Sequence, residues 1–180
     1  MKKLKSYKVL ESKKVYQGKV VDLVVDTIEI GGKEYIREAV RHPGGVVILG
    51  RRPDGRIPFV RQHRYPPDEI VLELPAGKLD EGEEPNQAAA RELEEETGYR
   101  AAGLRHVSSF YSTPGFCDEI LHFFHSDTLT ASHQSGGEED EILQVEFYTL
   151  SEALELATRG KIRDAKTLVA LYWLRINDGG

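Results

Sequence analysis

Glu92, Glu95 and Glu96 follow a glycine loop, in a stretch whose residues favour a short helix. At 100° per residue their side chains fall within an arc of about 100°, so one helix face carries all three carboxylates. An acidic face of this kind is ordinarily just solvated, but here Arg91 is the only cation nearby to offset the repulsion. Converging carboxylate oxygens suit a hard divalent cation, Mg²⁺ or Mn²⁺, that also takes phosphate oxygens and water as ligands.

The ends and the buried face of this helix can also be predicted. Pro85 suits the first helical position, because its missing N–H costs nothing there. Gly98 is placed to end the helix in the left-handed conformation. Ala90, Leu93 and Thr97 lie on a second face, which we expect to contact the body of the protein.

The stretch from Gly77 to Tyr99 resembles the Nudix box, whose pattern is glycine, five residues, glutamate, seven residues and Arg-Glu-apolar-any-Glu-Glu-any-Gly-apolar. The resemblance implies hydrolysis of a nucleoside diphosphate linked to another moiety, with water as nucleophile and a divalent metal. It also implies that Glu83 and Arg91 hold the loop against the helix. Nine positions at fixed spacing make the pattern specific, and only Tyr99 departs from it, standing where an aliphatic residue is usual. The matching residues are Gly77, Glu83, Arg91, Glu92, Leu93, Glu95, Glu96, Gly98 and Tyr99.

The same resemblance assigns the metal ligands. They would be the carboxylates of Glu92 and Glu96 and the backbone carbonyl of Ala76. Glu95 would be a further ligand or a catalytic group that orients water. Mg²⁺ is the expected cofactor, with Mn²⁺ as a substitute.

Residues outside the box resemble the ADP-ribose pyrophosphatase subfamily. Pro114 lies 15 residues beyond the box, where a proline distinguishes hydrolases of ADP-ribose and related sugar nucleotides; an ordinary Pro-Gly turn is the alternative. By this resemblance Arg61 contacts the diphosphate, Glu73 approaches the ribose or the metal, and Gly77 lies at the substrate. Arg64 is a weaker candidate, for which a surface or packing role is expected.

An acidic cluster at residues 136–141 follows a polar segment. Taken alone, such a run is a solvated loop. In the ADP-ribose pyrophosphatase subfamily, however, a mobile acidic loop at this point supplies a glutamate that activates the nucleophilic water. The resemblance makes Glu141 the first choice for this catalytic base and Glu139 the second.

Composition limits the class of protein. The chain has 180 residues and a net charge of −6, which argues against non-specific binding to nucleic acid or to an anionic membrane. No stretch approaches the roughly 20 apolar residues of a membrane span. Cys117 is the single cysteine, and nothing resembles a signal peptide. We therefore expect a soluble, cytoplasmic protein.

The remaining pattern is of strands followed by two helices. We expect residues 1–14 to be loosely held, residues 126–137 to form a loop, and Gly31-Gly32 to make a two-residue hairpin. Ser151 and Asp164 are the expected N-caps of the two C-terminal helices, 152–158 and 165–176. Strands are expected at 15–30, 33–40, 46–49, 57–61, 69–74, 104–111, 119–125 and 142–148.

This order predicts an α+β fold, and the resemblance implies the Nudix fold, an α/β/α sandwich with a mixed sheet. Residues 1–40 would be an N-terminal β extension and residues 41–180 the hydrolase domain. In this subfamily the extension exchanges strands to build a homodimer whose partner completes the adenine pocket. Tyr16 and Tyr35 are guesses for the residue that stacks on adenine.

Together these features predict a Mg²⁺-dependent ADP-ribose pyrophosphatase that releases AMP and ribose 5-phosphate. The same chemistry on another sugar nucleotide, such as GDP-mannose, is the alternative, because no residue in the sequence reads the base. A non-catalytic domain that senses an ADP-ribose-like ligand is a more distant one. Hydrolysis of RNA caps fits poorly with an acidic chain that has no basic groove.

Overall fold

The computed structural model describes residues 6–132 and 143–178. Contacts within the chain divide it into two compact units. Unit 1 comprises residues 1–44 and 111–120, and unit 2 comprises residues 45–110 and 121–180. Within the described ranges, no helix combines the length and apolar character needed to cross a membrane.

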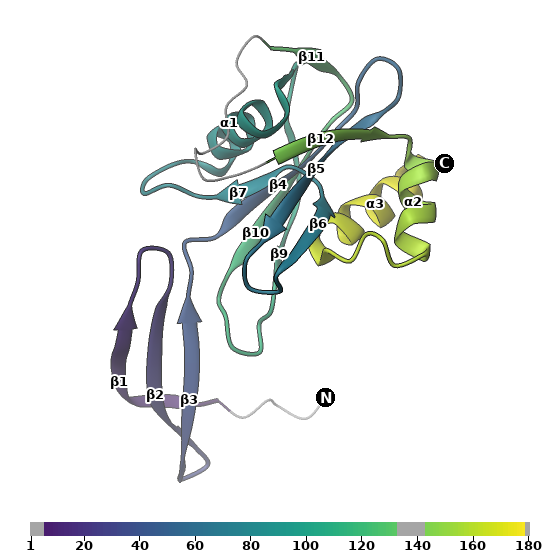
Figure 1. Cartoon of the computed structure of the whole chain (residues 1–180). Helices are drawn as coiled ribbons and strands as arrows, with labels where there is room; N and C mark the ends of the chain where they lie inside the picture. The colour runs from purple at the N-terminus through teal and green to yellow at the C-terminus, as the bar shows by residue number, and fades with distance from the viewer. Residues whose placement is uncertain (1–5, 133–142, 179–180) are drawn as a thin grey trace. The chain divides into compact units, whose positions relative to one another are not determined.

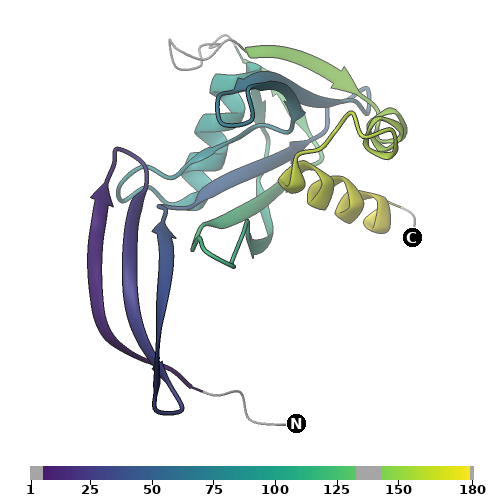
Figure 2. The ribbon, with the colours of Figure 1, turned by 60° about the horizontal axis from the view of Figure 1, so that its bottom comes forward.

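Unit 1 is built on an antiparallel sheet of order β1-β2-β3 (Figure 2). Gly31 and Gly32 connect the second and third strands with φ angles of 62° and 78°, which confirms the predicted two-residue hairpin. The segment 111–120 attaches to the end of the sheet, where the Val40 N–H donates to the Phe116 carbonyl at 2.7 Å. The strands are β1 (Lys8–Gln17), β2 (Asp22–Ile30) and β3 (Lys33–Arg41).

Residues 8–14 of β1 were not predicted to form a strand, since they were expected to be loosely held. Residues 15–17 fall in the stretch 15–30 that was predicted to be continuous, and the structure interrupts this stretch at residues 18–21, between β1 and β2. Residues 8–14 instead pair with β2, with one register shift between Val9 and Glu11, and Lys14 forms an ion pair with Asp22. Backbone hydrogen bonds to a neighbouring strand do not depend on side-chain polarity, so pairing overrides weak strand propensity here.

Unit 2 contains a four-stranded sheet of order β7-β4-β10-β9, a three-stranded sheet of order β12-β5-β6 and the pair β11-β8. The short strands β7, β8 and β11 were not predicted, and β11 falls within the segment expected to be a loop. The strands are β4 (Gly45–Gly50), β5 (Ile57–Arg64), β6 (Glu69–Glu73), β7 (Ala76–Lys78), β8 (Tyr99–Ala101), β9 (Arg105–Tyr111), β10 (Ile120–Ser126), β11 (Leu129–Ala131) and β12 (Leu143–Tyr148).

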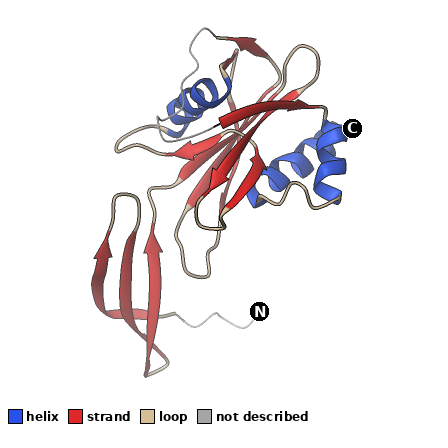
Figure 3. Ribbon diagram, in the orientation of Figure 1, coloured by secondary structure: helices blue, strands red, loops and turns tan. Residues whose placement is uncertain are grey.

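Helix α1 (Pro85–Thr97) lies on one side of these strands, and α2 (Leu150–Thr158) and α3 (Ala165–Asn177) lie together on the other (Figures 1 and 3). Strand β4 runs between the layers and is buried along its whole length. Val46 and Ile48 contact the core beneath α1, whereas Val47 and Leu49 contact the core beneath α2 and α3. A strand covered on both faces reads as a continuous apolar run. The α/β/α sandwich is therefore confirmed.

The predicted ends of α1 are confirmed. Pro85 occupies the first turn, and Gly98 closes the helix with φ of 70° while its N–H donates to the Glu94 carbonyl. The predicted packing face is wrong in one position, because Ala90 is exposed. Leu93 and Thr97 are buried as predicted, and Ala89, four residues before Leu93, is fully buried in place of Ala90.

The start of α2 also differs from the prediction. Thr149, not Ser151, is the N-cap, because it forms a capping box with Glu152. The Glu152 N–H donates to the Thr149 hydroxyl at 3.2 Å, and the Thr149 N–H donates to the Glu152 carboxylate at 2.7 Å. Asp164 caps α3 as predicted, accepting a hydrogen bond from the Thr167 N–H.

Candidate active site

Arg91 joins the glycine loop to the acidic face of α1. Its Nε and Nη2 each donate to Glu83 at 2.9 Å, forming a bidentate pair. Its Nη1 donates to Glu92 at 2.7 Å and to Glu95 at 3.1 Å. The Glu83 hydrogen bond raises the pKa of Arg91, and the same bond lowers the pKa of Glu83. One guanidinium thus offsets the repulsion among three carboxylates.

Gly77 lies against the carboxylate of Glu92. A Cβ added at Gly77 would come within 2.0 Å of the Glu92 Cδ, so this site has no room for a side chain. Strand β7 holds the glycine in place, because Gly77 pairs with Val46 of the buried strand β4. The close approach of loop and helix therefore depends on glycine at this position.

Glu96 contacts the same loop from the next turn of α1. It is only 7% exposed, and its carboxylate accepts a hydrogen bond of 2.9 Å from the Ala76 N–H. The structure thus brings Ala76, Gly77, Glu92 and Glu96 together. A buried carboxylate such as that of Glu96 is destabilising unless it accepts hydrogen bonds, and the Ala76 N–H donates one of them.

The carboxylates of Glu92 and Glu96 beside the Ala76–Gly77 backbone fit a hard divalent cation by donor type, since both offer oxygen atoms. The carboxylates of Glu92 and Glu96 lie against this backbone, and Arg91 donates a hydrogen bond to both Glu92 and Glu95. Within residues 6–132 and 143–178, no group of three or more acidic, His or Cys side chains forms a ready-made metal site. A cation here would be held by Glu92 and Glu96 together with backbone oxygen.

Glu73 is 1% exposed and lies between two cations. The Arg64 Nε donates to its carboxylate at 2.7 Å, and the ammonium of Lys166, at the start of α3, contacts its other oxygen. Paired on both oxygens, this buried carboxylate holds Arg64 next to the strand that leads to Ala76. Sequence reasoning missed Lys166, which lies 93 residues away from Glu73 and carries no local signal.

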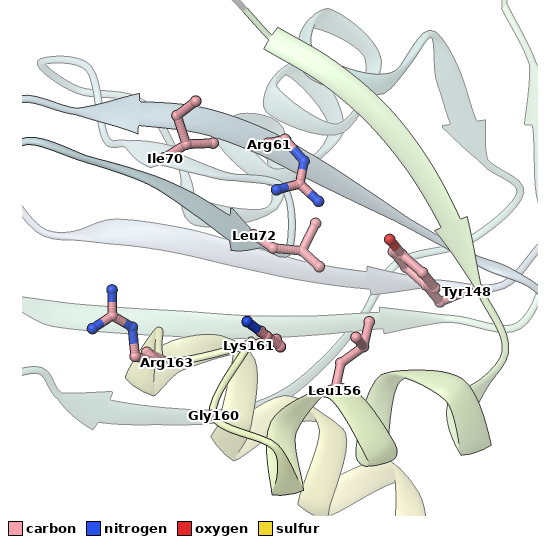
Figure 4. A pocket seen from close by; sticks show the side chains of 8 residues that line it. All are labelled: Arg61, Ile70, Leu72, Tyr148, Leu156, Gly160, Lys161 and Arg163. Atoms are coloured by element: carbon pink, nitrogen blue, oxygen red, sulfur yellow. The ribbon is translucent and has the colours of Figure 1, made fainter.

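Arg61 lies elsewhere. It is directly opposite Leu72, which belongs to the core beneath α2 and α3, and it points into a cavity on that side (Figure 4). Its Nε and Nη2 donate to Glu146 at 2.8 and 3.2 Å, and this pairing raises the pKa of Arg61. The Tyr148 hydroxyl donates to the same carboxylate. The structure therefore does not bring Arg61 to the Ala76–Gly77 backbone.

Other predicted residues lie in unit 1 or outside the described residues. Pro114 is exposed, in a turn where the Phe116 N–H donates to the Thr113 carbonyl at 3.3 Å. Tyr35 lies beneath the Arg37 guanidinium at 5.6 Å, and Tyr16 is 58% exposed. The two candidates for the catalytic base lie outside the described residues; they are Glu139 and Glu141.

The chain is similar to several known proteins. The chain is 42% identical to the ADP-ribose pyrophosphatase of Bacillus subtilis (95% of this chain, 94% of the relative). It is 38% identical to the methanol dehydrogenase activator of Bacillus methanolicus (99% and 97%) and 34% identical to the GDP-mannose pyrophosphatase of Yersinia enterocolitica (80% of each). A crystal structure of an ADP compounds hydrolase superposes with a TM-score of 0.84 at 21% identity, covering 98% of each chain. The family model of the NUDIX domain matches residues 41–171, and the chain belongs to the Nudix hydrolase family.

Proposed function

We propose that this protein hydrolyses ADP-ribose with water, breaking the diphosphate bond to give AMP and ribose 5-phosphate. The observation that carries the proposal is the approach of Glu92 and Glu96 to the Ala76–Gly77 backbone. We choose ADP-ribose over other sugar nucleotides as the proposed substrate because relatives from Bacillus subtilis and Mycobacterium tuberculosis are named ADP-ribose pyrophosphatases.

Nudix hydrolases generally use a divalent metal. We propose Mg²⁺, with Mn²⁺ as a substitute, and its chemistry would be to neutralise the diphosphate and acidify a bound water. Glu92, Glu96 and the Ala76 carbonyl would be its ligands. Arg91 donates to the carboxylates of Glu92 and Glu95, and Glu95 would be a further ligand or would orient water.

The proposed base is a glutamate of the acidic segment, Glu141 first and Glu139 second. Glu141→Gln should lower kcat more than it changes KM, because the carboxylate accepts a proton only during the chemical step. If Glu139→Gln shows this effect and Glu141→Gln does not, the assignment moves to Glu139.

On the substrate side we propose roles for Gly77 and Glu73. The backbone of Gly77 would contact the diphosphate, and Glu73 would hold Arg64 as a cation that binds it. We also propose a cytoplasmic homodimer, joined through the apolar residues that unit 1 exposes. They include Val9, Val15, Tyr16 and Ile36.

The test is product release from ADP-ribose, ADP-glucose, GDP-mannose and NADH, with Mg²⁺ and with a chelator. We expect metal-dependent release of AMP, fastest from ADP-ribose. Glu92→Gln and Glu96→Gln should each lower kcat/KM by about 100-fold or more while the fold is retained. Glu84→Gln is the matched control, since Glu84 is an exposed carboxylate at the start of the same helix.

Other outcomes lead to different conclusions. Near-normal rates for both variants at saturating Mg²⁺ would exclude the proposed site. A preference for GDP-mannose would keep the chemistry and change the substrate, and relatives from Yersinia enterocolitica and Cronobacter sakazakii are named GDP-mannose pyrophosphatases. Tight binding of one compound without turnover of any would indicate a sensor domain.

A further inference from the structure

A cavity of about 490 Å³ lies in unit 2 between the strands β5, β6 and β12 and the turn that connects α2 to α3 (Figure 4). Its volume is within the range of small-molecule sites. Helix α1 lies on the other side of the strands (Figure 1). The residues that matter here are Arg61, Leu72, Tyr148, Leu156, Lys161 and Arg163.

Three cations line this cavity, and they differ in their partners. Arg61 is paired with Glu146, so its charge is largely compensated. Arg163 pairs with Glu69, but its side chain is 64% exposed, and exposed pairs contribute little. Lys161 is exposed and has no acidic partner among the described residues. The cavity therefore offers one uncompensated ammonium and one guanidinium that can exchange its carboxylate for another anion.

The turn that carries Lys161 and Arg163 has a fixed backbone. Gly160 adopts φ of 66°, its N–H donates to the Ala157 carbonyl at 3.0 Å, and the Lys161 N–H donates to the Leu156 carbonyl at 2.8 Å. These are the two hydrogen bonds of a Schellman motif. Ile162, between the two cations, is 1% exposed and anchors the turn in the core. Because this turn is already ordered, an anion that binds Lys161 and Arg163 does not have to offset the free energy of ordering a loop.

The other walls are apolar. Leu72 and Leu156 belong to or contact the core beneath α2 and α3, and the ring of Tyr148 lies beside them (Figure 4). An inorganic anion would leave this surface unused, whereas a purely apolar ligand would leave Lys161 unused. We propose that the cavity binds a small organic phosphate monoester, its phosphate on Lys161 and Arg163 and its organic part on the apolar walls. The site is separate from the carboxylates of α1 and does not depend on the proposed function.

Phenyl phosphate is the probe, titrated calorimetrically into the full chain in the presence of a chelator, with inorganic phosphate for comparison. We expect one saturable site that binds phenyl phosphate more tightly than phosphate. Lys161→Ala should weaken binding by about tenfold, the loss expected for one charge-assisted hydrogen bond. Arg159→Ala is the matched control, because Arg159 precedes the same turn but does not line this cavity and pairs with Glu155.

Two further readouts locate the ligand. Amide shifts on binding should centre on Gly160 and Lys161, and Ile70→Ser, at a cavity residue 63% exposed, should weaken phenyl phosphate but not phosphate. The proposal is overturned if no saturable binding occurs at millimolar probe or if the shifts centre on α1. It is also overturned if Lys161→Ala and Arg159→Ala weaken binding equally, because the loss would then come from the lower net charge of the protein and not from a contact with Lys161.

Discussion

The backbone of Gly77 lies so close to the carboxylate of Glu92 that any side chain on residue 77 would overlap with it. The Nudix box places glycine there, and the structure gives the reason in terms of one atom, a Cβ that would be 2.0 Å from the Glu92 Cδ. No left-handed backbone is involved at this glycine, so the requirement is steric rather than conformational. The residue beside the carboxylate therefore controls where the carboxylate lies.

Gly77→Ala should lower kcat/KM by about 100-fold, because a displacement of about 1 Å at a reacting group has that effect. The flexible Glu92 side chain moves aside, so the melting temperature should change little. The matched control is Gly103→Ala, since a Cβ there meets no atom within 4 Å. Full activity in Gly77→Ala would contradict the proposed role of Glu92.

The Glu83–Arg91 pair predicts a pH dependence of stability. Glu83 has a pKa below its ordinary value of 4.5, because Arg91 donates to it. A carboxyl with a lowered pKa in the folded state stabilises the fold above its unfolded pKa, and this contribution is lost as pH falls through the folded value. In urea unfolding, the wild-type chain should be more stable than Glu83→Gln near neutral pH, and the difference should shrink below about pH 4.5. A difference independent of pH would exclude this linkage.

At the scale of elements, the ends of helices and turns could be predicted best where the residues at those positions set the backbone conformation themselves. The ends of α1 follow from Pro85 and Gly98, and the hairpin follows from Gly31-Gly32, because these residues fix their own backbone. The cap of α2 was misassigned to Ser151 because two hydroxyl residues lie close together; the glutamate three residues after Thr149 was the signal that distinguishes them. Strands β1, β8 and β11 have weak patterns, and pairing with distant segments makes them strands.

Thr167 connects α3 to the strand that leads into the site. It is fully buried, its hydroxyl accepts a hydrogen bond of 2.8 Å from the Leu74 N–H, and it donates to Asp164 at 2.6 Å. Thr167→Val keeps the shape but leaves a buried N–H unpaired, which should cost about 1–3 kcal/mol in the free energy of unfolding. Thr130→Val, at an exposed threonine of β11, is the control. Equal stability of the two variants would show that the buried bond contributes nothing.

At the scale of the molecule, long-range ion pairs were beyond sequence reasoning. Arg61 and Glu146 are 85 residues apart, and Glu73 and Lys166 are 93 apart. No spacing rule connects such residues, because their approach depends on how the sheet is assembled. The box helix could therefore be predicted with its carboxylates, whereas the partners of Arg61 and Glu73 could not.

Exposed apolar residues in unit 1 predict self-association. Tyr16 and Ile36 are 58% and 60% exposed, and burial of such side chains is the main favourable term in association. Light scattering should give twice the chain mass at working concentration, and Ile36→Glu should shift it toward the monomer. Glu34→Ala, at an exposed charge of the same strand, is the control. A monomeric mass for the wild-type chain would contradict the proposed dimer.

The parallel pairing of β4 with β10 joins residues 45–50 to residues 121–126, and Phe124 of β10 completes the core on which α1 rests. Contacts so distant along the chain form slowly, since the intervening segment must first be ordered. On the ribosome, the core beneath α1 stays incomplete until β10, which carries Phe124, has emerged. Pulsed hydrogen exchange during refolding should then show β4 and α1 amides becoming protected together with those of β10, so that the hydrolytic centre is among the last parts of the molecule to form.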